Sequence, residues 1–223
     1  MKWFLITLII LLVMAFWFLN LKKRSARGYT DVSATWDPPI QTGPILNTEE
    51  CKAIIDYAEP KFARSTLVAA EAIDNTRTSE TAWLPRDHEL SRKIIARAQE
   101  LTGKPFENCE DIQVVRYKPG TYYRPHHDSC CENNEPCINF EDEGGQRVGT
   151  VLVYLNDDFE NGFTSFPNYN QLRLKAPPGE GIFFRPLGRD DWRCHPYALH
   201  AGEPVTSGTK YLCNVWIRES RYK

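Results

Sequence analysis

The N-terminal part of the chain is a continuous hydrophobic segment. Residues 3–19 are apolar or small except for Thr7, and basic residues at 22–24 follow them closely. A helix of roughly 20 such residues spans the hydrocarbon core of a bilayer, whereas a signal peptide would end in a small-x-small cleavage site. We therefore expect an uncleaved membrane anchor with a single transmembrane helix over 1–24. A stalk or linker over 25–46 follows, where Gly and Pro interrupt any periodicity.

Two helices are predicted next, from apolar positions that recur at helical spacing. The first begins at Asn47 or Thr48, where a capping residue precedes two acids, and Pro60 ends it. The second covers about 87–101, and Gly103 follows as its stop. Beyond them the pattern changes to short strands separated by turn residues. The clearest predicted strands are 112–117, 147–155, 171–175, 181–184 and 211–218.

This order of elements, helices first and strands afterwards, predicts an α+β fold. The strand-rich half is expected to be an antiparallel sandwich or barrel. We expect a single catalytic domain over 47–223.

The charge of the chain is unevenly distributed. Its 223 residues include 27 Lys or Arg and 29 Asp or Glu, for a formal net charge of -2. Four of the basic residues lie in 1–24, so 23 basic and 29 acidic residues remain in the rest of the chain, a net charge of -6. Nucleic-acid binding depends on a clustered basic face, so this composition argues against a nucleic-acid partner. It also favours neutral or basic peptides as ligands.

Seven cysteines are many for a cytosolic domain of this size. Cys130, Cys131 and Cys137 could hold a disulfide loop in an oxidising compartment or part of a zinc site in a reducing one. Free thiols are the third possibility. The odd number leaves at least one cysteine unpaired within a monomer.

His126 and Asp128 form the most informative polar pair. They lie two residues apart, so on a strand they point to the same face while His127 points away. His200, which precedes the last predicted strand, is the best candidate for a third ligand. Two histidines and one carboxylate form the facial triad of non-haem Fe(II) oxygenases. Taken alone, a His-x-Asp pair is common and carries little weight.

Lys210 adds a second part to this pattern. It lies ten residues after His200 and begins the last predicted strand. A keto acid that chelates iron at one end needs a cation for its far carboxylate, and Lys210 can supply that charge. The alternative is a solvated lysine at the edge of a strand.

With these residues in place, the chain resembles the 2-oxoglutarate and Fe(II)-dependent prolyl 4-hydroxylases, in particular the short plant, algal and viral-type forms with an N-terminal anchor. The resemblance covers roughly 47–219. The matching segments, in chain order, are Arg77-Thr78-Ser79, 113–117, Gly120 with Tyr123 and Pro125, His126 with Asp128, 144–147, 150–157, Gly162 with Thr164, Phe166 and Pro167, and 200–202 with Pro204, Val205, Gly208, Lys210 and Trp216.

The resemblance implies a double-stranded β-helix, a jelly-roll relative, with the N-terminal helices packed against it. It implies that His126, Asp128 and His200 are the catalytic iron ligands. Lys210 would bind the C5 carboxylate of 2-oxoglutarate.

The resemblance also implies the reaction and further site residues. Fe(II), 2-oxoglutarate and dioxygen would hydroxylate a peptidyl proline at C4, giving succinate and carbon dioxide, and ascorbate would rescue oxidised iron. Tyr117 and Thr164 match positions in the cosubstrate pocket. Tyr123 and Arg147 match positions that contact the peptide, and Trp216 matches an aromatic residue near the catalytic centre on the substrate side. The expected substrate is a proline-rich protein or peptide in extended form.

Three departures from the family pattern bear on the substrate. The loop between Asp128 and Gly144 is longer than usual, Phe163 replaces a Glu or Ala, and Arg218 replaces a histidine. None of these changes removes an iron ligand or the cosubstrate cation. Two alternatives stay open: a dioxygenase that acts on another protein side chain, and a membrane-tethered binding module with a dead site.

Two signals disagree on localisation. The basic residues on both sides of the apolar run slightly favour a catalytic domain in the cytosol. The cysteines and the family resemblance favour the lumen of the endoplasmic reticulum, reached by a single-pass type II anchor. We choose the lumen, because charge bias sets orientation only statistically.

Overall fold

The computed structural model describes residues 36–65, 76–189 and 194–223, and within them it contains one large antiparallel sheet and two small ones. The large sheet has the order β1 (Ile40–Pro44), β10 (Glu180–Phe184), β6 (Arg147–Tyr154), β13 (Lys210–Arg218), β4 (Ile112–Tyr117), β3 (Glu80–Leu84) and β2 (Ala63–Arg64). The second sheet has the order β5 (Tyr123–His126), β11 (His200–Gly202), β8 (Thr164–Phe166) and β9 (Leu172–Leu174). The third pairs β12 (Val205–Gly208) with β7 (Phe159–Asn161).

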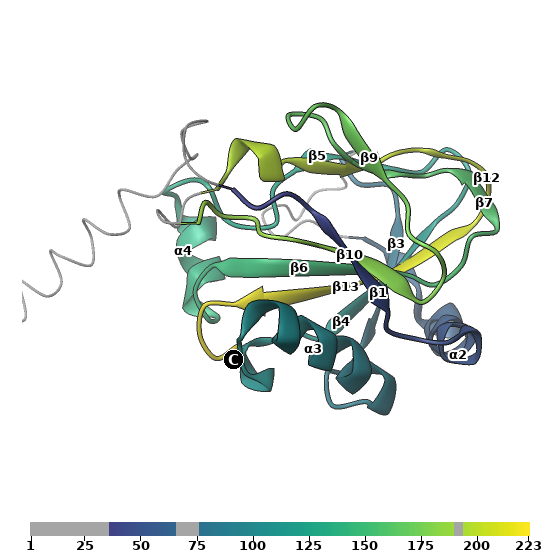
Figure 1. The fold of residues 1–223 in the computed structure, drawn as a ribbon, viewed down its shortest axis with the longest axis horizontal. Coiled ribbons are helices and arrows are strands. Elements are labelled where there is room, and N and C mark those ends of the chain that lie inside the picture. The colour runs from purple at the N-terminus through teal and green to yellow at the C-terminus, as the bar shows by residue number, and fades with distance from the viewer. Residues whose placement is uncertain (1–35, 66–75, 190–193) are drawn as a thin grey trace, which may run out of the picture.

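Three α-helices accompany these sheets: α2 (Thr48–Ala58), α3 (Glu89–Thr102) and α4 (Glu135–Asp142). Figure 1 shows α2 and α3 below the large sheet and the small sheets above it. The layers are therefore helix, large sheet and small sheet. This arrangement is consistent with a jelly roll whose N-terminal helices pack against one face.

Capping residues set the start of α2 and both the start and the end of α3. Asn47 accepts a hydrogen bond from the backbone of Glu50, whose own carboxylate accepts one from the backbone of Asn47, so the two form a capping box. The second helix begins at Glu89, because the His88 side chain accepts from the backbone N–H of Leu90. Gly103 ends it in the left-handed conformation at φ 68°.

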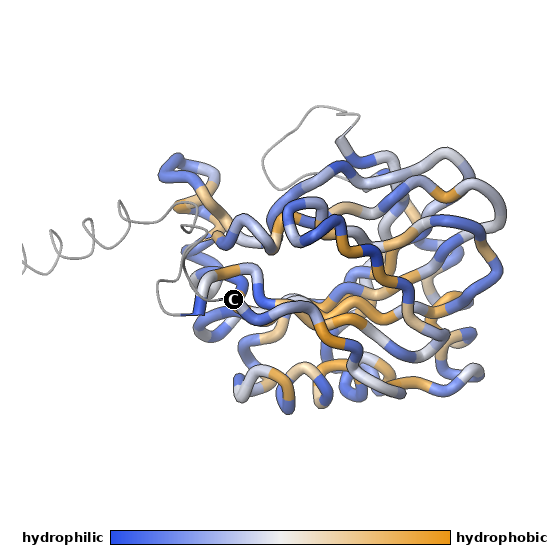
Figure 2. The backbone as a smooth tube through the Cα atoms, turned by 45° about the horizontal axis from the view of Figure 1, so that its top comes forward, coloured by the Kyte–Doolittle hydropathy of each residue, from blue (hydrophilic) through white to orange (hydrophobic). Residues whose placement is uncertain are grey.

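The large sheet separates two hydrophobic cores. All eight residues of β6 are buried, because helices cover one face of this strand and the small sheet covers the other. Along β13, Cys213, Val215 and Ile217 pack with the helices, whereas Leu212 belongs to the core between the sheets. Figure 2 shows the same concentration of hydrophobic residues along the central strands.

The predicted α+β order and the main predicted strands are confirmed. One expectation is wrong: the sequence predicts a linker over 25–46, but residues 40–44 within it form β1 and pair antiparallel with β10. The helix α4 was also missed, within the long loop after Asp128. Gly and Pro in residues 40–44 hide the strand pattern in the sequence. The segment is a strand because β10 pairs with it.

The predicted anchor over 1–24 lies outside the described residues. Among the residues that the structure does describe, no helix combines the length and the apolar composition needed to cross a membrane.

Candidate active site

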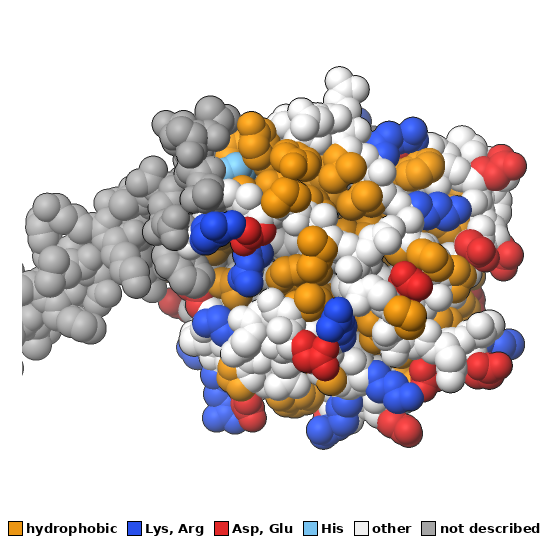
Figure 3. Space-filling model, viewed as in Figure 1, with side chains coloured by type: hydrophobic (Ala, Val, Ile, Leu, Met, Phe, Trp, Pro, Cys, Tyr) orange, Lys and Arg blue, Asp and Glu red, His pale blue; other side chains and the backbone are white. Residues whose placement is uncertain are grey.

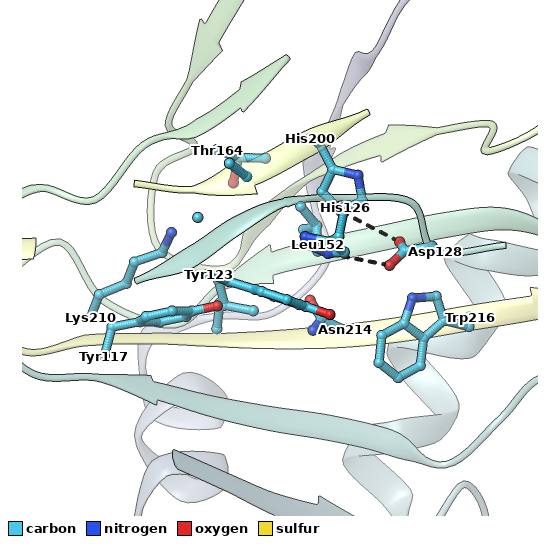
Figure 4. Close-up of a pocket in the computed structure, with 13 residues that line it drawn as sticks. Tyr117, Tyr123, His126, Asp128, Leu152, Thr164, His200, Lys210, Asn214 and Trp216 are labelled. Atoms are coloured by element: carbon cyan, nitrogen blue, oxygen red, sulfur yellow. Dashed lines mark ion pairs between the residues drawn. The ribbon is translucent and has the colours of Figure 1, made fainter. Parts of the chain in front are cut away.

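His126 and His200 meet on neighbouring strands of the small sheet. They are register partners across the antiparallel pair β5 and β11, and Asp128 follows two residues after His126. The Nε2 atom of His126 lies 3.7 Å from Oδ1 of Asp128, and the Nε2 atom of His200 lies 3.7 Å from Oδ2. Figure 4 shows the three side chains converging on one point of the cavity. The structure thus brings together the three predicted iron ligands.

Hydrogen bonds from outside the triad orient each of these groups. Nδ1 of His126 lies 2.8 Å from the carbonyl oxygen of Arg124, and Nδ1 of His200 lies 3.0 Å from that of Ala198. Each Nδ1 therefore donates to a carbonyl, and in a neutral imidazole Nε2 then carries the lone pair on the side of Asp128. The hydroxyl of Thr150 donates to Oδ2 of Asp128 at 2.7 Å.

The pKa shifts of His126 and Asp128 suit a bound cation. Burial lowers the pKa of His126 well below its usual 6.5, and the neighbouring His200 lowers it further. Burial alone would raise the pKa of Asp128, but His200, His126 and Arg147 together lower it to about 2. Metal binding needs neutral imidazoles and an ionised carboxylate. One ligand atom from each of His126, Asp128 and His200 lies within 4.8 Å of the others, so this donor set fits a single Fe(II) ion.

A second group of potential ligands lies nearby, formed by His127, Cys131 and Cys194. Its two sulfur atoms are joined in the disulfide Cys131–Cys194, so neither is available as a thiolate. A further disulfide joins Cys130 to Cys137. Of the possibilities that the sequence left open for these cysteines, the structure shows disulfides, and Cys194 is a partner that sequence spacing did not reveal.

Lys210 lies deep in the same cavity, with 1% of its surface exposed. Its ammonium donates to the carbonyl oxygen of Gly162 at 2.6 Å and lies 4.7 Å from the centre of the Tyr154 ring. Burial lowers its pKa to about 7. Within the described part of the chain no carboxylate pairs with Lys210, so this buried cation suits the far carboxylate of a dicarboxylic acid.

Tyr117 and Thr164 line the cavity around Lys210. Tyr117 is the register partner of Lys210 across β4 and β13. The hydroxyl of Thr164 lies 2.8 Å from that of Tyr154. Gly202 leaves room for the Tyr117 ring, because a Cβ atom there would lie 3.2 Å from the Tyr117 hydroxyl.

Asn214 lines the cavity as well, and sequence reasoning missed it. It lies four residues after Lys210 on β13, and alternate residues of a strand share a face. The alternation from Lys210 through Leu212 and Asn214 to Trp216 could have revealed it.

Comparisons with known proteins agree with this geometry. The family model of the 2OG-Fe(II) oxygenase superfamily matches residues 112–218. A protein of Acanthamoeba polyphaga mimivirus that is named as a prolyl 4-hydroxylase is 38% identical over 195 residues, which cover 87% of this chain and 80% of that protein. The chain belongs to the prolyl 4-hydroxylase family. Prolyl 4-hydroxylase 1 of Arabidopsis thaliana is 32% identical, over 83% of this chain and 70% of the plant protein.

A solved structure supports the same family. The viral collagen prolyl hydroxylase of Paramecium bursaria Chlorella virus 1, in its complex with 2-oxoglutarate, is 31% identical, with a TM-score of 0.62. The match covers 81% of this chain and 96% of the viral one. This prolyl 4-hydroxylase is therefore a 2-oxoglutarate and Fe(II)-dependent oxygenase that hydroxylates proline.

Beside the triad of this prolyl 4-hydroxylase lies an open groove of about 770 Å³, which His126 and Asp128 help to line. Tyr123 stacks on His126 with their ring centres 3.5 Å apart. Tyr123, Arg147 and Trp216, the three predicted substrate-side residues, all line the groove.

Arg147 differs from a freely presented peptide-binding arginine. Its guanidinium is buried and donates to both carboxylate oxygens of Glu110, at 2.7 and 2.8 Å. The guanidinium carbon lies 3.7 Å from the centre of the Trp216 ring. Arg218 donates to the same Glu110 at 2.5 Å. Sequence reasoning missed Glu110, and this network holds Arg147 and Trp216 in position behind the groove.

Proposed function

We propose that this prolyl 4-hydroxylase binds Fe(II) through His126, Asp128 and His200 and anchors 2-oxoglutarate through Lys210. It hydroxylates C4 of a peptidyl proline and releases succinate and carbon dioxide, and ascorbate keeps its iron reduced. The observation that carries this proposal is that the triad and Lys210, a buried lysine with no carboxylate partner among the described residues, line one cavity between the two sheets. When bound, iron and 2-oxoglutarate supply the oxidising chemistry.

The side chains of the cavity position the reactants. The ammonium of Lys210 would hold the far carboxylate of 2-oxoglutarate, and the triad at the other part of the same cavity would receive the keto-acid end. The hydroxyl of Thr164, paired with Tyr154, borders the same site. Apolar Leu152 and Leu212 line the cavity too and limit the water within it. On the groove side, Tyr123 and Trp216 offer aromatic faces to a proline ring.

The proposal is tested by mass spectrometry of proline-rich peptides incubated with the protein, Fe(II), 2-oxoglutarate and ascorbate. We expect a mass gain of one oxygen on proline and one succinate for each hydroxylation. His126→Ala should abolish both products. His88→Ala is the matched control, because that imidazole caps α3 and is not among the cavity residues. Oxygen on leucine or lysine instead of proline would favour a dioxygenase of another side chain. Peptide binding without any turnover would favour a dead binding module.

We also propose that residues 1–24 anchor the enzyme in the membrane of the endoplasmic reticulum as a single-pass type II protein, with a stalk before the catalytic domain in the lumen. The two disulfides support this placement, because disulfides persist in oxidising compartments. Protease treatment of sealed microsomes tests the orientation. We expect the catalytic domain to be protected until detergent is added; digestion without detergent would place it in the cytosol.

A further inference from the structure

The groove that leads to the triad is lined by more positive than negative side chains. Its basic lining residues are Lys61, Arg64, Arg77 and Arg147, and its acidic ones are Asp128 and Glu132. Asp128 belongs to the proposed iron site. Arg147 is already paired with Glu110, which it shares with Arg218. Among the groove-lining residues that the structure describes, this leaves the cations Lys61, Arg64 and Arg77 and the carboxylate of Glu132 to face a bound peptide.

Arg77 is the most unusual of these cations, because it is 95% buried and its side chain has no acidic partner among the described residues. Its exposed fraction is 5%. It donates to the hydroxyl of Ser79 at 2.9 Å and to the side-chain oxygen of Gln113 at 2.9 Å, and both partners are neutral. No carboxylate of the described residues pairs with it. A buried charge without a counter-charge is costly, and a planar guanidinium suits a carboxylate in a bidentate geometry.

Lys61 and Arg64 extend this positive charge along the rim of the groove. Both are exposed. Lys61 lies over the Tyr57 ring at 3.0 Å from its centre, and within the described residues neither cation has a carboxylate partner. Glu132, the remaining acid, is exposed and accepts a hydrogen bond from Asn134. Exposed charges of this kind steer a ligand of opposite sign more than they bind it.

The charge of the groove is opposite to that of the domain as a whole. The net charge of -6 outside the N-terminal segment favours neutral or basic peptides. On the face shown in Figure 3, however, basic and acidic side chains are interspersed over the helical half without a patch of one sign. Because peptide recognition depends on the local field, the groove residues decide selectivity.

We propose that the groove selects proline peptides that carry an Asp or Glu side chain close to the target proline. This inference rests on the proposed function and narrows its substrate class. The acidic side chain pairs with Arg77, and Lys61 and Arg64 attract it to the groove.

The position of that acid follows from the stacked rings. The guanidinium carbon of Arg77 lies 4.8 Å from the centre of the Tyr123 ring, which itself stacks on the ring of His126. An extended peptide advances roughly 3.3 Å per residue. The acid therefore lies within about two residues of the proline at the triad.

The test compares peptides of identical length that contain one proline and differ only at the second residue before or after it, as Glu, Gln or Lys. We expect kcat/KM for hydroxylation to be roughly tenfold higher with Glu than with Gln at one of these positions, and lowest with Lys. Anisotropy of labelled peptides under anaerobic conditions should give the same order of Kd without turnover. The preference should weaken as salt is added.

Variants of the protein test whether the groove cations cause the preference for Glu over Gln. Because Arg77 is buried and its loss could impair folding, the test uses the exposed pair, K61E with R64E. We expect this variant to have a smaller Glu-over-Gln ratio of kcat/KM than the wild type, because two added carboxylates at the groove repel the acidic side chain on its way to Arg77. K52E is the matched control, since Lys52 pairs with Asp56 on α2 and does not line the groove. It should keep the preference.

The two levels of the proposal fail in different ways. Equal turnover of the Glu and Gln peptides, or a preference for Lys, would overturn the acidic selectivity and leave proline hydroxylation in place. Failure to hydroxylate any proline peptide would instead overturn the proposed function.

Discussion

His126 and His200 face each other as register partners on β5 and β11, with their ring centres 4.2 Å apart. The ring nitrogen of each that points away from Asp128 is held by a carbonyl two residues earlier in the chain. The proposed metal geometry is therefore set by sheet register. A slip of one residue would turn one imidazole to the opposite face of the sheet.

Thr150→Val should weaken metal binding by about tenfold, because Asp128 would lose the hydroxyl that orients Oδ2 while the side-chain volume hardly changes. Titration of the protein with Fe(II) or Co(II) measures the apparent Kd. The control is Thr42→Val, which removes a hydroxyl that accepts from the backbone of Gly181 on the far edge of the large sheet. An unchanged metal affinity in Thr150→Val would show that the hydroxyl does not orient the ligand.

The affinity for 2-oxoglutarate should fall as the pH rises above 7. Burial lowers the pKa of Lys210 to about 7, so the free enzyme loses the positive charge that attracts the dicarboxylate above this pH. Binding to the neutral form must then take up a proton, which calorimetry in buffers of different ionisation enthalpy detects. Lys210→Met should bind weakly at every pH and take up no proton. Proton uptake that persists in Lys210→Met would assign it to another group.

Glu110→Gln should destabilise the fold strongly. Removing the charge leaves Arg147 and Arg218 buried without their counter-ion, at a cost of about 3–5 kcal/mol in the free energy of unfolding. Denaturant unfolding measures the loss. Glu100→Gln is the control, since Glu100 forms an exposed pair with Arg97 and its loss should cost less than about 1 kcal/mol.

The lowered pKa of Glu110 also predicts that the fold loses stability in acid. Burial raises the pKa of Glu110, but Arg147 and Arg218 outweigh it and leave the folded pKa below the usual 4.5. The ion pairs therefore contribute fully above pH 4.5, and this contribution is lost as the pH falls toward the folded pKa. Unfolding free energies from pH 6 downward should converge for wild type and Glu110→Gln. Parallel curves would contradict this assignment.

The disulfide Cys131–Cys194 should stabilise the domain more than Cys130–Cys137. The first closes a loop with a sequence separation of 63 and the second one of 7. Loop-closure entropy predicts losses of about 4 and about 2.5 kcal/mol when each pair is replaced by serines. Denaturant unfolding of the two double variants gives the comparison, and equal losses would show that strain or residual structure outweighs loop length.

Much of the local structure was predictable from sequence, because its causes lie within a few residues. The capping box of Asn47 with Glu50 and the left-handed Gly103 depend only on neighbouring backbone groups. The strands β4, β6 and β13 also followed from local composition. The candidate iron ligands His126 and Asp128 could be paired because residues two apart on a strand point to the same face of the sheet.

Tertiary structure decided what depends on distant segments. β1 is a strand because β10 supplies its hydrogen bonds, and Cys194 became the partner of Cys131 only when the chain brought them together. Likewise, the charge of the groove could not be read from composition. Sequence gives the sum of all charges, whereas burial and pairing determine which of them remain to act on a ligand. Within the described part of the chain the side chain of Arg77 donates to two neutral groups, Ser79 and Gln113, so its charge is not compensated there.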